Sequence, residues 1–167
     1  MLHDRPSMRV EKNDPLYLQA ERVFSQGVSW KNEVPENGSP SCFSVEDGSI
    51  KLQEGMSFEE SWSAFFFESF NRQNSQQFEK VLEKGSSLSR EEWVRQNAHL
   101  EYEASQNFLA FSDTVLLPYF RTHSLDTLLL EDLHRNFSQD FENWMKAPEE
   151  SYPWNYWGKF YDENFSK

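Results

Sequence analysis

Cysteine is almost absent from this sequence, since Cys42 is the only one among 167 residues. A single cysteine forms no internal disulfide bond, and it excludes metal sites built from several thiolates. Cys42 lies in a stretch where apolar and polar residues alternate, and a small thiol in such a setting usually packs as an unreactive side chain. We therefore expect neither a disulfide framework nor catalysis by a cysteine nucleophile.

Glycine is also scarce, with six residues that do not cluster. The glycine-rich loops that hold phosphates, GxxxxGK[ST] and GxGxxG, are missing, and so is the GxSxG turn of serine hydrolases. The four histidines form no HxH or HxxxH pair of the kind that binds zinc. These absences exclude the common nucleotide-binding and hydrolytic enzymes, and we expect no metal and no cofactor.

Basic residues are fewer than acidic ones: the chain has 16 lysine and arginine residues and 28 aspartate and glutamate residues, which gives a formal net charge of −12. Nucleic acids and anionic membranes attract the opposite balance of charge. No apolar run has the length of a signal peptide core or a membrane helix. We therefore expect a cytoplasmic protein that binds neither nucleic acid nor membrane, and whose acidity suits a basic protein partner.

Aromatic side chains are abundant: fifteen Phe, six Trp and six Tyr make up 16% of the chain. Each buried aromatic ring removes roughly 150–250 Å² from water. The overall hydrophobic fraction is only 37%. The composition therefore predicts a core made of few but large side chains, with the carboxylates outside.

Helix start signals divide most of the chain. Asp14 followed by Pro15 is a typical first turn, and Ser57 and Ser89 each open a capping box. We expect the helix after Ser89 to run to Pro118, and Ser124 to begin a last helical region that Pro148 closes.

A different pattern occupies the region near residues 42–52, where apolar and polar residues alternate on both sides of a glycine-containing turn. This pattern predicts a small β-hairpin. Together the signals predict a mainly α fold, an irregular helical bundle of about five helices with a small β-hairpin. We divide the chain into a flexible N-terminal segment (1–12), a helical domain (13–148) and an aromatic-rich C-terminal tail (149–167).

The C-terminal tail offers candidate binding residues without a clear helical period. Trp and Tyr are favoured anchors at protein interfaces. The tail either folds back on the bundle, or forms an interface with a partner or with a second copy of the chain, and the sequence leaves the oligomeric state open. The candidate anchors are Trp154, Tyr156, Trp157 and Phe160.

A second candidate site is polar. The segment from Phe67 to Asn71 keeps the central glutamate, Glu68, of a His-Glu-x-x-His helix but replaces both histidines. With Glu101 and Glu103 on the following long helix, it resembles the helix pair of zinc metalloproteases over about a fifth of the chain. The resemblance implies a degenerate, inactive site, because Phe67 and Asn71 stand where the zinc ligands would be. The candidate polar pocket comprises Glu68, Asn71, Glu101 and Glu103.

Two functional hypotheses follow. The leading one is a non-enzymatic, acidic intracellular domain that binds a protein partner in the manner of immunity proteins, inhibitors or regulators, an analogy of class and not of family. The alternative is the degenerate metalloprotease-like domain with its carboxylate site around Glu68 and Glu101/Glu103. The first predicts a surface that complements a basic partner, and the second predicts converging carboxylates with a perturbed pKa.

Overall fold

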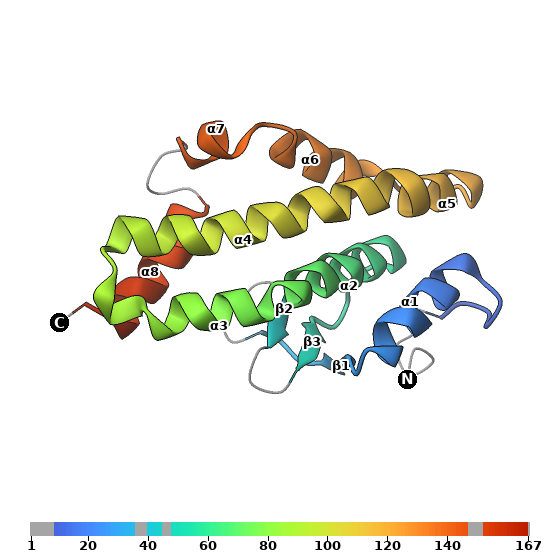
Figure 1. The fold of residues 1–167 in the computed structure, drawn as a ribbon. Coiled ribbons are helices and arrows are strands. Elements are labelled where there is room, and N and C mark those ends of the chain that lie inside the picture. The colour runs from blue at the N-terminus through green and yellow to red at the C-terminus, as the bar shows by residue number, and fades with distance from the viewer. Residues whose placement is uncertain (1–8, 36–39, 45–47, 147–151, 167) are drawn as a thin grey trace.

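The computed structural model describes residues 9–35, 40–44, 48–146 and 152–166. It is mainly α-helical with a small sheet, which confirms the predicted fold class (Figure 1). The helices are α1 (Pro15–Ser25), α2 (Phe58–Gln73), α3 (Ser75–Glu83), α4 (Arg90–Phe111), α5 (Leu117–Thr122), α6 (Leu128–Phe137), α7 (Phe141–Met145) and α8 (Trp154–Asn164). The strands are β1 (Ser29–Asn32), β2 (Ser41–Ser44) and β3 (Ser49–Leu52).

The three predicted helix starts are formed by side-chain caps. Asp14 is the N-cap of α1, and its carboxylate accepts the backbone N–H of Leu16 at 2.8 Å. Ser57 and Ser89 make complete capping boxes at the first turns of α2 and α4. Each cap satisfies donors that a helix start leaves unpaired, so these boundaries follow from local chemistry alone.

The predicted hairpin is present as the antiparallel pair β2 and β3, in which Ser41 pairs with Leu52 and Ser44 pairs with Ser49. The turn between these strands, residues 45–47, lies outside the described residues. No sequence pattern predicted β1, which pairs with β3 in parallel and makes the strand order β1-β3-β2. The sheet packs against α2 through β2 and β3.

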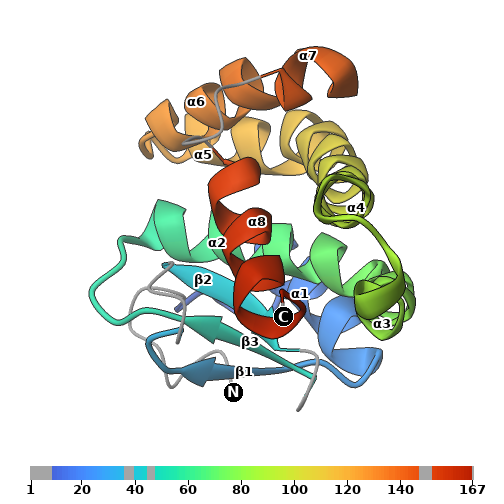
Figure 2. The same cartoon turned by 90° about the vertical axis from the view of Figure 1, so that its left-hand side faces the viewer.

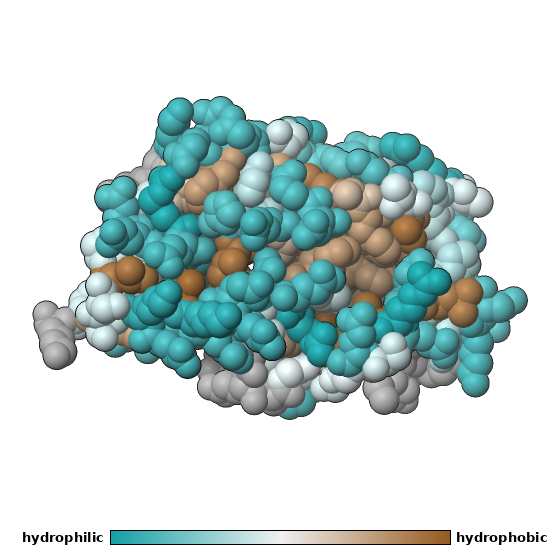
Figure 3. All heavy atoms as spheres, viewed as in Figure 1, coloured by the Kyte–Doolittle hydropathy of each residue, from teal (hydrophilic) through white to brown (hydrophobic). Residues whose placement is uncertain are grey.

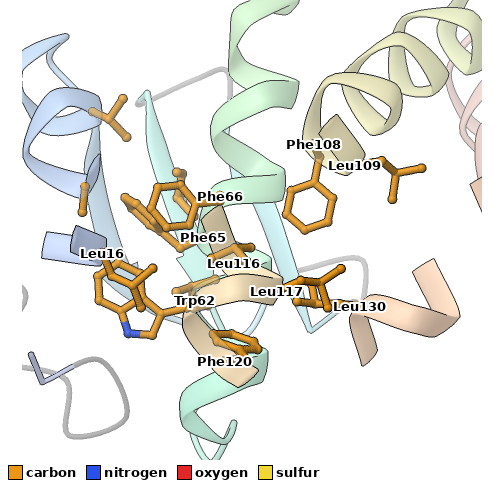
Figure 4. Close-up of a cluster of buried hydrophobic side chains, with 14 residues drawn as sticks. Leu16, Trp62, Phe65, Phe66, Phe108, Leu109, Leu116, Leu117, Phe120 and Leu130 are labelled. Atoms are coloured by element: carbon orange, nitrogen blue, oxygen red, sulfur yellow. The ribbon is translucent and has the colours of Figure 1, made fainter. Parts of the chain in front are cut away.

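The main core lies between α1, the sheet, α2 and the α4–α5 region. Its largest fully buried side chains include Trp62, Phe65, Phe108 and Phe120, and Figure 4 shows them directed toward one shared interior. A second cluster surrounds Trp93 and Trp144 at the other end of α4. Large rings therefore form both parts of the core, as the aromatic composition predicted.

A band of apolar side chains is visible between α4 and α2 in the space-filling view (Figure 3). Near α1 this band ends in a small pocket of about 150 Å³, lined by Phe66, Phe70 and Phe111 together with glutamine and arginine side chains. Arg72 on its rim donates to the backbone carbonyl of Gln26 at 2.7 Å. The pocket is therefore a shallow gap in the aromatic packing of α1, α2 and α4.

Two expected boundaries were wrong. The long helix does not end at Pro118, because a π-helical turn (Ser112–Leu116) resets the hydrogen-bond register and α5 then begins with a proline in its first turn. Ser124 does not open the next helix; it follows the end of α5 with a positive φ of 54°, and α6 begins at Leu128. Pro148 and residues 1–8 of the predicted flexible segment lie outside the described residues.

The aromatic tail contains a regular helix, α8. It stands across the ends of α2 and α4, as the turned view shows (Figure 2), and it contacts α4 along its length. Among the helices in the described ranges, none has both the length and the apolar character that crossing a membrane requires.

Candidate functional site

Glu68 is the one charged side chain that is buried among the described residues, with 5% of its surface exposed. Three groups donate hydrogen bonds to it: the Ser41 hydroxyl at 2.8 Å, the Phe43 backbone N–H at 3.0 Å and the Asn71 side-chain amide at 3.1 Å. Burial raises the pKa of Glu68, and these bonds act in the opposite direction. Because two of the donors belong to β2, the carboxylate ties the sheet to α2.

Glu101, on α4, is the second acidic residue of this site. The indole N–H of Trp157 on α8 donates to its carboxylate at 2.9 Å, and the Tyr152 hydroxyl donates a second hydrogen bond. The pKa of Glu101 is raised to about 7: burial is the main cause, the nearby charge of Glu68 also raises it, and the two hydrogen bonds lower it. This carboxyl therefore titrates near neutral pH, where an ordinary glutamate is ionised.

Tyr152 completes the group. The residue is 40% exposed overall, but its hydroxyl group is buried next to the Glu101 carboxylate. Burial of that hydroxyl, followed by the charge of Glu101, raises the Tyr152 pKa well above its ordinary value. The phenol therefore stays a hydrogen-bond donor across the physiological range, which suits a partner that is an ionised carboxylate.

The predicted polar pocket is assembled in part. Asn71 joins the cluster through its bond to Glu68, and its side-chain oxygen is buried without a protein partner. Glu103 does not join: its side chain is 52% exposed, and its Oε1 lies 3.8 Å from Nδ1 of His99. Glu68, Asn71 and Glu101 thus form a closed cluster between α2 and α4, and Glu103 faces solvent.

The four aromatic residues proposed as interface anchors are partly buried. The Trp93 ring contacts both Trp157 and Phe160, with the Phe160 ring stacked at 5.6 Å between centroids. The Trp154 indole N–H donates to the Met145 carbonyl at 2.9 Å. Tyr156 contacts the Tyr152 and Trp157 rings. Trp154, Trp157 and Phe160 therefore pack against the second core cluster, and Tyr156 is held by its neighbours in the tail.

The described residues contain no set of zinc ligands that would support the resemblance to zinc metalloproteases. Phe67, at the position of the first zinc ligand, packs edge-on against Phe108 and stacks with Phe137. Across the described ranges, no three His, Cys, Asp or Glu side chains come together as a metal site. The chemistry left to Glu68 and Glu101 is that of a protonatable pair enclosed beneath α8.

A separate cleft lies at the opposite end of the molecule, where the start of α1, the start of α2 and the end of α5 meet (right in Figure 1). It is an open cavity of about 610 Å³. Its lining comprises Arg9, Val10, Glu11, Asp14, Phe58, Tyr119, His123 and Leu125. Charged, aromatic and apolar groups therefore converge here, which is the usual composition of a binding site.

One wall of the cleft is built from Tyr119, Asp14 and His123. The Tyr119 hydroxyl donates to the Asp14 carboxylate at 2.7 Å, and burial raises the Tyr119 pKa well above its ordinary value. The His123 ring stacks on Tyr119 with centroids 4.0 Å apart, and its Nδ1 lies 2.9 Å from the Tyr119 carbonyl oxygen. These contacts fix the orientation of all three side chains.

Sequence reasoning missed this cleft. Tyr119 and His123 are four residues apart on one helix, a spacing that was readable, but no local pattern connects them with Asp14, which lies 105 residues away in the chain. Asp14 was identified only as a helix cap, and it performs that role with its other carboxylate oxygen. No protein-family model, curated protein or solved structure matches this chain.

Proposed function

We propose that this protein is a non-enzymatic, acidic protein-binding domain whose partner carries a positively charged surface. The observation that supports it is the distribution of charge. The chain carries 28 acidic residues, and among the described ones Glu68 alone is fully buried, while the carboxyl of the half-buried Glu101 is enclosed beneath α8. Carboxylates therefore face outward from nearly every element, while the aromatic side chains fill the interior.

A charged surface of this kind influences the rate of association, because it attracts the partner before the two proteins touch. An excess of one charge sign attracts the opposite sign over roughly 8–10 Å at physiological ionic strength, which speeds and orients encounter. The exposed leucines of α6 add an apolar element to this surface, with Leu128 65% and Leu129 38% exposed. Asp126 precedes them, and its carboxylate accepts the Leu128 backbone N–H at 2.8 Å.

Capture of partners from the source organism at a series of salt concentrations tests the proposal. Purified protein is compared with a variant in which Glu54, Glu79, Glu83 and Glu91 are changed to Gln, all of them exposed carboxylates that leave the caps intact. We expect a basic protein that binds faster to the wild type at low salt, with the difference removed at high salt. A chain that retains no partner at any salt concentration would contradict the proposal.

A second candidate is the degenerate metalloprotease-like carboxylate site, now centred on Glu68 and Glu101. The convergence of these two acids and the Glu101 pKa of about 7 favour it, since a carboxyl that titrates near neutrality suits general acid–base chemistry. Elemental analysis and assays of peptide and ester hydrolysis test it, with Glu101→Gln as the inactive reference. Equal background hydrolysis by wild type and variant would rule out catalysis by this carboxylate pair.

A further inference from the structure

We infer that the cleft between α1, α2 and α5 receives an ammonium or guanidinium side chain presented by the partner. This inference rests on the proposed function, because it names the surface and the chemical group through which a basic protein would be held. It concerns a site distinct from the carboxylate cluster under α8. The residues that carry it are Glu11, Asp14, Phe58, Tyr119 and His123.

The apolar part of the lining fits the stem of a long basic side chain. Val10, Phe58 and Leu125 come from three different segments and line the cleft together. Lysine and arginine bury their methylene stems against apolar surface and keep the charged end with polar groups. A volume of about 610 Å³ leaves room for the backbone that presents such a side chain.

The polar part of the lining fits the cation. Asp14 is held in place by Leu16 and Tyr119, and each of its carboxylate oxygens keeps a lone pair for a further donor. Glu11 supplies a second carboxylate, and the aromatic rings of Phe58 and Tyr119 in the lining attract a cation through their π systems. The wall is thus already organised in the free protein, which lowers the entropy lost on binding.

The balance of charge favours a cation over an anion. The lining holds two carboxylates, Glu11 and Asp14, against one guanidinium, Arg9. The whole molecule adds its net charge of −12 to the same sign of potential. The neighbouring surface continues this character, because Glu59, beside Phe58, accepts the backbone N–H of Asp126 at 3.2 Å, next to the exposed Leu128.

Titration with agmatine, a guanidinium on a short alkyl chain that also carries an amine, tests the inference without the partner. The signals of the His123 and Tyr119 rings are followed by NMR, with butanol and glutarate as neutral and anionic probes. We expect saturable shifts with agmatine, and no saturation with butanol or glutarate. Shifts that saturate with glutarate alone, or with no probe, would overturn the inference.

Variants separate the role of charge from the role of structure. Glu11→Gln and Asp14→Asn each remove one charge; Asn is as good a helix cap as Asp, so α1 is retained, although its amide nitrogen does not accept the Tyr119 hydrogen bond. Each change should weaken agmatine binding about fivefold, the equivalent of roughly 1 kcal/mol for an exposed ion pair. Glu21→Gln removes a carboxylate from α1 outside the cleft and should leave binding unchanged.

The captured partner supplies the final comparison. The inference holds if a basic partner binds, if Asp14→Asn and Glu11→Gln each weaken that binding, and if Glu21→Gln leaves the binding unchanged. If the partner binds all three variants equally, the cleft is not its site, although the proposed function stands. If no partner binds but agmatine titrates the cleft with the expected dependence on Glu11 and Asp14, the proposed function fails and a small cationic ligand takes its place.

Discussion

The indole N–H of Trp157 points at the carboxylate of Glu101, 2.9 Å away, so that the C-terminal helix is docked on a buried acid of α4. Other contacts hold α8 as well: Arg90 forms a two-pronged ion pair with Asp162, and the Tyr161 hydroxyl donates to the Leu88 carbonyl at 2.8 Å. Of these contacts, the one at Glu101 involves a group that titrates near neutral pH. This relationship makes α8 docking sensitive to pH.

Replacing Glu101 by Gln should change how stability depends on pH. The folded-state pKa of about 7 lies above the ordinary value of 4.5, so the contribution of this group is fully present below pH 4.5 and is lost as pH rises through 7. The loss is of the order of 3 kcal/mol. The free energy of unfolding of Glu101→Gln, minus that of the wild type, should therefore rise from pH 4.5 to about pH 7. Above pH 7 this difference should stay constant.

Urea unfolding at pH values from 4.5 to 8.5 measures this difference. Glu103→Gln is the matched control, because it removes an exposed carboxylate two residues further along the same helix. Its profile should follow that of the wild type. Parallel profiles for wild type and Glu101→Gln would show that Glu101 titrates normally and that burial does not perturb it.

Replacing Trp157 by Phe should cost more at high pH than at low pH. Phe keeps an aromatic ring against Trp93 but removes the donor to Glu101, which leaves a buried ionised carboxylate short of one hydrogen bond. We expect a loss of about 1–3 kcal/mol at pH 8.5 and a smaller loss at pH 4.5, where the carboxyl is protonated.

The matching control is Trp154→Phe. Its indole N–H donates to the backbone carbonyl of Met145, a neutral acceptor, so the loss should be the same at both pH values. A double-mutant cycle of Trp157→Phe with Glu101→Gln isolates the coupling between the two side chains. Zero coupling at pH 8.5 would mean that the hydrogen bond does not stabilise α8.

Local chemistry explains which parts of the fold were predictable. The caps at Asp14, Ser57 and Ser89 act over three residues, so the starts of α1, α2 and α4 could be placed from sequence. The β2–β3 hairpin followed from alternation on both sides of a turn. β1 is mostly exposed, and only its pairing with β3, formed from residues twenty positions away, defines it.

The site was less predictable because its contacts are long-range. The spacing of Glu68 and Asn71 on one helix turn indicated that they share a face, and the structure brings them together with Glu101. Glu103 was grouped with Glu101 although positions two apart on a helix face different directions, so that error was avoidable. The meeting of Trp157 with Glu101 depends on how α8 crosses α4, which no local pattern encodes.

Ser124 offers a test of backbone strain. It has a φ of 54° directly after α5, and the Leu125 N–H closes the helix end on the Phe120 carbonyl at 2.9 Å. This left-handed position after a helix is one where Gly is preferred. Ser124→Gly should raise the free energy of unfolding by about 0.5 kcal/mol, whereas Ser124→Val should lower it by about 1 kcal/mol or more.

The control is Ser138→Gly, at the end of α6. Ser138 has an ordinary right-handed φ of −76°, so glycine there relieves nothing and only adds freedom to the unfolded chain. We expect Ser138→Gly to lower stability by about 0.5 kcal/mol in thermal or urea unfolding. Stabilisation by both substitutions, or by neither, would mean that the conformation at Ser124 carries no strain.

Two glycines, Gly85 beside the end of α8 and Gly158 within α8, should respond differently to the same added methyl group. A Cβ on Gly85 would meet the ring of Phe165, which is held against Trp93 and Tyr161. A Cβ on Gly158 would meet the guanidinium of Arg90, the end of a flexible, exposed side chain. The first obstacle is fixed by packing, and the second can move.

Gly85→Ala should therefore destabilise the protein by about 1–3 kcal/mol, the usual cost of overpacking. Gly158→Ala should gain about 1 kcal/mol because alanine favours the helical conformation in α8. Moving Arg90 weakens its exposed ion pair with Asp162, which contributes less than about 1 kcal/mol, so the substitution should be neutral or slightly stabilising. Unfolding curves read through Trp fluorescence measure both, because Trp93 lies beneath the helix. Equal losses for the two variants would show that Arg90 is held as firmly as Phe165, and that the ion pair with Asp162 contributes to docking α8 as much as the aromatic contacts do.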